Sequence, residues 1–189
     1  MKKLALLFVM FSGLTIAQIS SNSIKLGDYK EGGIVFYLDE SGEHGLVCSL
    51  SDQSNATTWS KQKAVRKNER MSENFHTSKT IFGNKYERRE ARNVKNALKL
   101  CKKLKVEING EKFKDYYLPS KEHLLILYKN LDLVNKALES NDGQKIKSAI
   151  YWSSIEYDYT NAMVLNFKDG KEGHYYKNYL YNVRAIRAF

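Results

Sequence analysis

Hydrophobic and polar positions beyond residue 30 alternate in short blocks that are typical of strands joined by tight turns. β-Branched and aromatic side chains fill residues 32–38 (GGIVFYL) and 44–50 (HGLVCSL), and the segment between them (DESGE) has turn chemistry. This pattern predicts a β-hairpin near the start of the folded domain. Similar blocks near the C-terminus predict further strands over 149–153, 162–167 and 181–189, with a turn at 168–170.

Two other stretches have the three- and four-residue spacing of a helix. Apolar side chains recur in this way over residues 86–105, and Lys and Arg occupy most of the positions between them. A second helix is predicted over about 120–130, because Ser120 follows Pro119 as an N-cap and an apolar face (LLILY) comes next. A third, short helix is predicted over 131–138. The chain therefore has the order of elements of an α+β fold with two main helices.

The first 17 residues have the layout of a secretory signal peptide. Lys2 and Lys3 form a basic start, an uncharged apolar run fills residues 4–16, and Ala17 closes a small-residue cleavage site. The run is too short to span a bilayer, which takes about 20 residues. An N-terminal core helix is the alternative interpretation. The sequence thus predicts an exported protein that is periplasmic, at the cell surface or secreted, with one domain over residues 18–189 and no membrane span.

Charge is distributed unevenly along the chain. The 189 residues include 31 Lys and Arg against 21 Asp and Glu, a formal charge of +10, and 42% are hydrophobic, which is enough to bury a core. Loss of residues 1–17 would leave +8. Residues 61–105 alone hold fifteen Lys and Arg with four Glu, a net charge of +11. A basic balance favours polyanionic partners, and export argues against genomic nucleic acid as that partner.

The basic segment 61–105 contains a short pattern associated with heparin binding. Residues 101–106 (CKKLKV) fit the order X-B-B-X-B-X, in which B is a basic residue. On a helix, the basic side chains would form a stripe opposite the apolar one. The alternative is an ordinary solvated helix face, because Lys and Arg keep exposed helices soluble. The predicted polyanion-binding residues are Arg88, Arg89, Arg92, Lys95, Lys99, Lys102, Lys103 and Lys105.

Catalytic and metal-binding patterns are absent from the sequence. It has no HExxH, P-loop or GxSxG motif and no CxxC pair or Cys/His cluster, so we expect neither an enzyme nor a metal or cofactor site. The two cysteines, Cys48 and Cys101, leave two interpretations open. In an oxidising compartment they would pair in a disulfide, whereas their apolar neighbours fit two small buried hydrophobes.

Four residues in the C-terminal part are predicted to serve the structure. Trp152 lies in an apolar strand with serine neighbours and is predicted to pack into the core. Arg184 and Arg187 are three apart, so in one continuous strand they would face opposite sides and one would point inward. A buried guanidinium needs an acceptor, and Glu156 is the predicted partner. Two solvated arginines on an edge strand are the alternative.

Three motifs in a fixed order resemble a known family. They are GGIVFYLDESGEHGLV near the start, DYYLPSKEHLLILY in the middle, and YWSS followed by YNVRAIRAF at the end. Together they resemble the bacterial domains of unknown function typified by the C-terminal domain of a collagen-like adhesin, and the Fibrobacter-type major paralogous domain. The resemblance implies a C-type-lectin-like α+β fold, in which the N- and C-terminal strands pair and two helices flank a small twisted, mostly antiparallel sheet. It also implies extracellular or surface roles with glycosaminoglycan binding.

These observations predict a non-catalytic, exported, adhesin-like domain that binds anionic polymers through its basic segment. Sulfated glycan, lipopolysaccharide and extracellular DNA are such polymers. The alternative is a structural or assembly protein of the cell envelope that binds another protein, because tyrosine is favoured at interfaces. Six tyrosines gather in the C-terminal part, namely Tyr157, Tyr159, Tyr175, Tyr176, Tyr179 and Tyr181.

Overall fold

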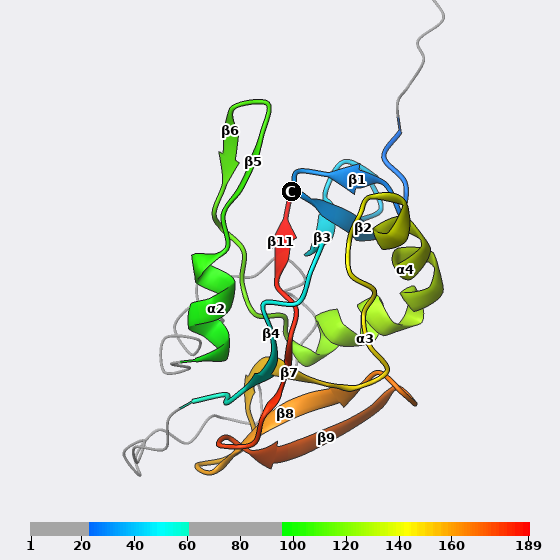
Figure 1. The fold of residues 1–189 in the computed structure, drawn as a ribbon. Helices are drawn as coiled ribbons and strands as arrows, with labels where there is room; N and C mark the ends of the chain where they lie inside the picture. The colour runs from blue at the N-terminus through cyan, green and yellow to red at the C-terminus, as the bar shows by residue number, and fades with distance from the viewer. Residues whose placement is uncertain (1–22, 61–95) are drawn as a thin grey trace, which may run out of the picture.

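The computed structural model describes residues 23–60 and 96–189, and within these ranges the strands form three sheets accompanied by three helices (Figure 1). Neighbouring strands are antiparallel except for one parallel pair. The mixture of helices and antiparallel strands confirms the predicted α+β class. The predicted signal peptide, residues 1–17, and most of the basic segment, residues 61–95, lie outside the described residues.

The predicted N-terminal hairpin lies at the centre of a four-stranded sheet. The order is β1 (Tyr29–Lys30), β2 (Gly33–Leu38), β3 (Gly45–Ser49) and β11 (Ile186–Ala188). Strands β2 and β3 confirm the hairpin, and the C-terminal strand β11 pairs with β3 in the register Arg187↔Val47. The N-terminal strand β1 lies at the opposite edge and pairs with β2. Gly45 is required in this sheet, since a Cβ there would lie 2.2 Å from the carbonyl oxygen of Tyr37.

A five-stranded sheet holds most of the C-terminal part. The order is β4 (Ser54–Thr57), β10 (Tyr181–Val183), β7 (Ile150–Glu156), β8 (Asn161–Asn166) and β9 (Lys171–Tyr176). The strands β7 and β8 confirm the predicted blocks. Strand β9 was not predicted, because its sequence (KEGHYY) has no apolar face. It lies at the edge of the sheet, where five of its six residues are exposed.

The predicted continuous strand over 181–189 is wrong. Strand β10 ends at Val183 and β11 begins at Ile186, because the chain leaves the five-stranded sheet at this point and enters the four-stranded sheet. The break places Arg184 between the two sheets, where its side chain is buried. The C-terminal segment, with β10 in one sheet and β11 in the other, therefore joins the two sheets.

The three described helices are α2 (Ala97–Lys103), α3 (Lys121–Lys129) and α4 (Leu131–Ser140). The helix α3 confirms the second predicted helix, and Ser120 caps it by accepting a hydrogen bond of 3.3 Å from the backbone N–H of His123. The helix α4 confirms the third. The predicted extension of the first helix to residue 105 is wrong, because Leu104 is already extended and a hairpin follows at once. That hairpin is β5 (Val106–Ile108) with β6 (Glu111–Phe113).

Two hydrophobic clusters lie on opposite faces of the five-stranded sheet. Trp152 and Tyr151 are neighbours on β7 and point to opposite faces, because side chains alternate along a strand. Trp152 packs with α2, whereas Tyr151 packs with α3 and α4. In Figure 1, α2 and the β5–β6 hairpin accordingly lie on one side of β3 and β11, and α3 and α4 lie on the other. Trp152 is fully buried, which confirms its predicted core position.

Candidate functional site

The described end of the basic segment lies on α2, with its charges outward. Ala97 and Cys101 are buried on one side of this helix, and Lys99, Lys102 and Lys103 are exposed on the other. Residues three and four apart on a helix are neighbours, with about 5–6 Å between their Cβ atoms. The three lysines therefore form one stripe, as predicted for this part of the segment.

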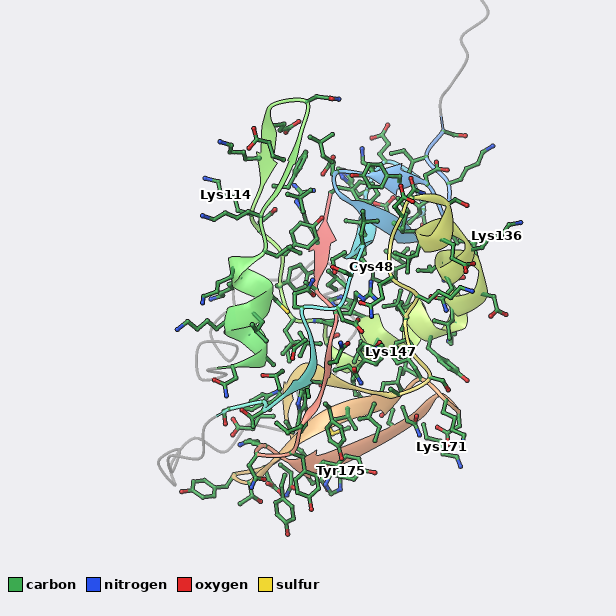
Figure 2. All side chains as sticks on the ribbon, viewed as in Figure 1. Cys48, Lys114, Lys136, Lys147, Lys171 and Tyr175 are labelled. Atoms are coloured by element: carbon green, nitrogen blue, oxygen red, sulfur yellow. The ribbon has the colours of Figure 1, made fainter. Side chains whose placement is uncertain are left out.

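Two further lysines extend the stripe beyond the helix. Lys105 follows α2 and Lys114 follows β6, and both are exposed. In Figure 2, Lys114 lies at the edge of the molecule on the side of α2, and Lys136 lies at the opposite edge. We call Lys99, Lys102, Lys103, Lys105 and Lys114 the α2 lysine face. The predicted residues Arg88, Arg89, Arg92 and Lys95 lie outside the described part of the chain.

The α2 lysine face is not neutralised by the carboxylates that the structure describes. Every ion pair among the described residues uses other cations, and none includes a member of this face. Lys112, on the same hairpin as Lys114, differs in this respect because it pairs with Glu107 at 3.4 Å. Lys114 was not predicted as a site residue, since only the hairpin brings it to the side of α2.

An open hollow of about 400 Å³ lies beside Lys114. Its lining comes from residues 111–115 of the hairpin and from Arg187. The Arg187 guanidinium binds Glu31 and, at 2.5 Å, Asp115, and it lies 4.8 Å from the centre of the Phe113 ring. Because two carboxylates already neutralise Arg187, this arginine adds no free positive charge to the lysine face.

Of the two arginines, Arg184 is the one that points inward. The prediction that Glu156 is its partner is wrong. The Arg184 guanidinium donates to the carboxylate of Asp52 at 2.7 Å, and both side chains are buried. It also donates to the carbonyl oxygens of Ser49 at 2.8 Å and Gln144 at 2.9 Å. Asp52 lies 132 residues away in the sequence, so no local pattern could identify it. This network joins β3, β10 and the loop before β7.

Glu156 instead pairs with a buried lysine at the far end of the five-stranded sheet. The Lys177 ammonium donates to the Glu156 carboxylate and to the carbonyl oxygens of Asp158 at 2.7 Å and Tyr159 at 2.8 Å. The backbone N–H of Lys177 donates to Thr160 at 2.9 Å. Lys177 therefore ties the β7–β8 turn to the segment that crosses from β9 to β10.

The six tyrosines of the C-terminal part gather around this anchor. Tyr157 and Tyr159 lie in the β7–β8 turn, and the ring of Tyr157 stacks on His174 with 3.8 Å between ring centres. The other four touch one another as a group that continues inward, because the ring of Tyr181 packs on the buried Trp152. We call this group the tyrosine cluster, and it consists of Tyr175, Tyr176, Tyr179 and Tyr181.

The two cysteines are free thiols, so the structure contains no Cys48–Cys101 disulfide. Both are buried, Cys101 in the cluster beside α2 and Cys48 in the cluster beside α3 and α4. Burial raises the pKa of Cys48 to about 11 and raises that of Cys101 further. Both cysteines therefore fit the second interpretation, that of small buried hydrophobes.

We expect these thiols to be unreactive in the folded protein. A thiol reacts as its thiolate, and burial suppresses both access and ionisation. Protein kept free of reductant should give no colour with Ellman's reagent at pH 8, and should titrate two thiols once it is unfolded in guanidinium chloride. Finding no thiol in the unfolded protein would contradict the free-cysteine structure.

Within residues 23–60 and 96–189, no three His, Cys, Asp or Glu side chains lie close enough together to hold a metal ion. The helices of the same residues are all too short or too polar to cross a bilayer. Comparison with protein-family models and with curated proteins finds no match for this chain.

Proposed function

We propose that this protein is an exported, non-catalytic binding domain that captures anionic polymers on the α2 lysine face. The observation that carries the proposal is the clustering of five exposed lysines that no described carboxylate neutralises. Four of them fall within residues 99–105.

The chemistry of the face favours a polymer over a small ligand. Lysine ammonium groups on exposed flexible stems act as point charges, without the rigid fork that recognises one phosphate or carboxylate. Their attraction for a polyanion adds up over many contacts and is increased by the counterions that the polymer releases. A sulfated glycan, a lipopolysaccharide or extracellular DNA each supplies such a row of charges, and the glycan accords with the resemblance to adhesin domains.

Heparin chromatography in a sodium chloride gradient tests this proposal. The triple variant K102E/K103E/K105E should elute at clearly lower salt than the parent protein, because three attractive contacts become repulsive. The log–log slope of affinity against salt should become shallower by about two to three, roughly 0.7–0.9 for each lost contact.

A matched control separates the lysine face from net charge. The triple variant K129E/K136E/K168E changes the charge equally, and these exposed lysines also lack a described carboxylate partner. Lys136 lies at the edge of the molecule opposite Lys114 (Figure 2). The control should elute close to the parent. Equal shifts for both variants would contradict a localised site.

A further inference from the structure

Large aromatic and aliphatic side chains stay exposed at one end of the five-stranded sheet. Tyr176, Tyr179 and Leu180 are 51%, 45% and 61% exposed, and all three lie at the crossover from β9 to β10. Tyr157 and Tyr159, in the neighbouring β7–β8 turn, are exposed to the same degree. In Figure 2, the labelled Tyr175 lies at this end, away from α3 and α4. Apolar side chains that stay exposed together are a feature of binding surfaces.

The rings are held in place before any ligand arrives. The Lys177 ammonium and backbone fix the crossover to the β7–β8 turn, as described above. A tight turn closes the crossover, with the backbone N–H of Tyr179 donating to Tyr176 at 2.8 Å. The two rings then meet edge to face, with 5.6 Å between their centres. Because this geometry exists in the free protein, little conformational entropy is lost on binding.

The described charged groups around the tyrosine cluster are ion-paired or hydrogen-bonded within the protein. Lys177 and Glu156 neutralise each other. Burial acts to raise the pKa of Asp158. The hydrogen bonds that Asn161 and Thr160 donate to its carboxylate outweigh this effect and hold the pKa below its ordinary value. On β9, Glu172 pairs with Lys121. The cluster therefore offers a ligand aromatic faces and phenol hydroxyls. The Asp158 carboxylate in the neighbouring turn keeps its negative charge, since no described cation pairs with it, and this charge disfavours an anionic ligand.

The chemistry of the patch favours one kind of uncharged partner. Among the described residues, six large side chains are exposed here, and five of them are tyrosines. A phenol ring has an apolar face and a polar edge, and a sugar ring has the complementary arrangement of C–H faces and hydroxyl edges. We propose that the tyrosine cluster binds uncharged sugar rings, which stack on Tyr176 and Tyr179 and hydrogen-bond to the hydroxyl groups around them.

The proposed sugar site shares no residue with the α2 lysine face. It depends on ring stacking and hydrogen bonds rather than on charge, so the two proposals can be tested separately. The probes are uncharged hexasaccharides of glucose, mannose, galactose and N-acetylglucosamine, observed by saturation-transfer NMR in 0.5 M sodium chloride. We expect at least one to bind. Binding should weaken at least tenfold in Y176A/Y179A and stay within threefold of the parent in Y176F/Y179F, because phenylalanine keeps the stacking face.

Two controls make the result specific. Tyr29 is 43% exposed on β1, in the other sheet, and Tyr29→Ala should leave binding unchanged. The K102E/K103E/K105E variant should also bind normally, even if it fails on heparin, so failure of one proposal is distinguishable from failure of the other. Unfolding midpoints of the double variants, measured alongside, test whether these variants fold.

Three results would overturn the sugar site. One is the absence of binding to every hexasaccharide at millimolar concentration. Another is equal loss in Tyr29→Ala and in Y176A/Y179A. The third combines self-association of the parent in sedimentation, its loss in Y176A/Y179A, and the absence of sugar binding. This result would assign the tyrosine cluster to contact with a second copy of the chain.

Discussion

Replacing Arg184 with methionine should lower the free energy of unfolding by about 3–5 kcal/mol, because it leaves the Asp52 carboxylate buried without its cation. The carboxylate would keep the hydroxyl of Tyr151, which donates to it at 3.1 Å. Two carbonyl oxygens, those of Ser49 and Gln144, would also lose their donor. An isolated charge and unsatisfied acceptors in a low dielectric are among the largest costs that a single substitution can impose.

Chemical unfolding followed by tryptophan fluorescence measures this cost, since Trp59 and Trp152 are both buried. The midpoint in urea should fall while the slope stays unchanged. Arg187→Met is the matched control. Its partners Asp115 and Glu31 are 65% and 26% exposed, so both carboxylates keep contact with water after the substitution and the cost should be only about 1–2 kcal/mol. Equal costs for the two variants would contradict the account of the buried network.

Replacing Lys177 with methionine should cost about 2–3 kcal/mol, less than the loss of Arg184. The Lys177 side chain is buried, but that of Glu156 is 20% exposed, so water partly compensates the carboxylate that is left behind. The same substitution removes the donor that joins the β7–β8 turn to the crossover. We therefore expect it to loosen the tyrosine cluster as well and to weaken any sugar binding there.

Lys171→Met provides the comparison for this second variant. Lys171 pairs with Asp169 but is 81% exposed, and an exposed ion pair of this kind contributes less than about 0.5 kcal/mol. A near-neutral Lys171→Met beside a costly Lys177→Met is the expected result of urea unfolding. If the Lys177 variant unfolded at the parent midpoint, the buried anchor would have no energetic role.

The elements that could be predicted are those with a local signal. The β2–β3 hairpin has two apolar strands around a turn, and α3 has both an N-cap at Ser120 and an apolar face. The exposed lysines of α2 likewise follow from helical spacing. Strand β9 could not be predicted, because an exposed edge strand needs no alternation of apolar residues. The break between β10 and β11 could not be predicted either, because no local sequence signal shows that the chain passes from one sheet to the other.

The sequence by itself determined the α+β class, the positions of the hairpin and of α3 and α4, and the concentration of positive charge in residues 61–105. These depend on turns, caps and periodicity, whose energies act between residues close in the chain. Only the tertiary structure decided that Arg184 meets Asp52, that Glu156 meets Lys177, and that Lys114 lies on the same side as α2. Such pairings join distant segments, and their strength arises from burial that exists only once the sheets have assembled.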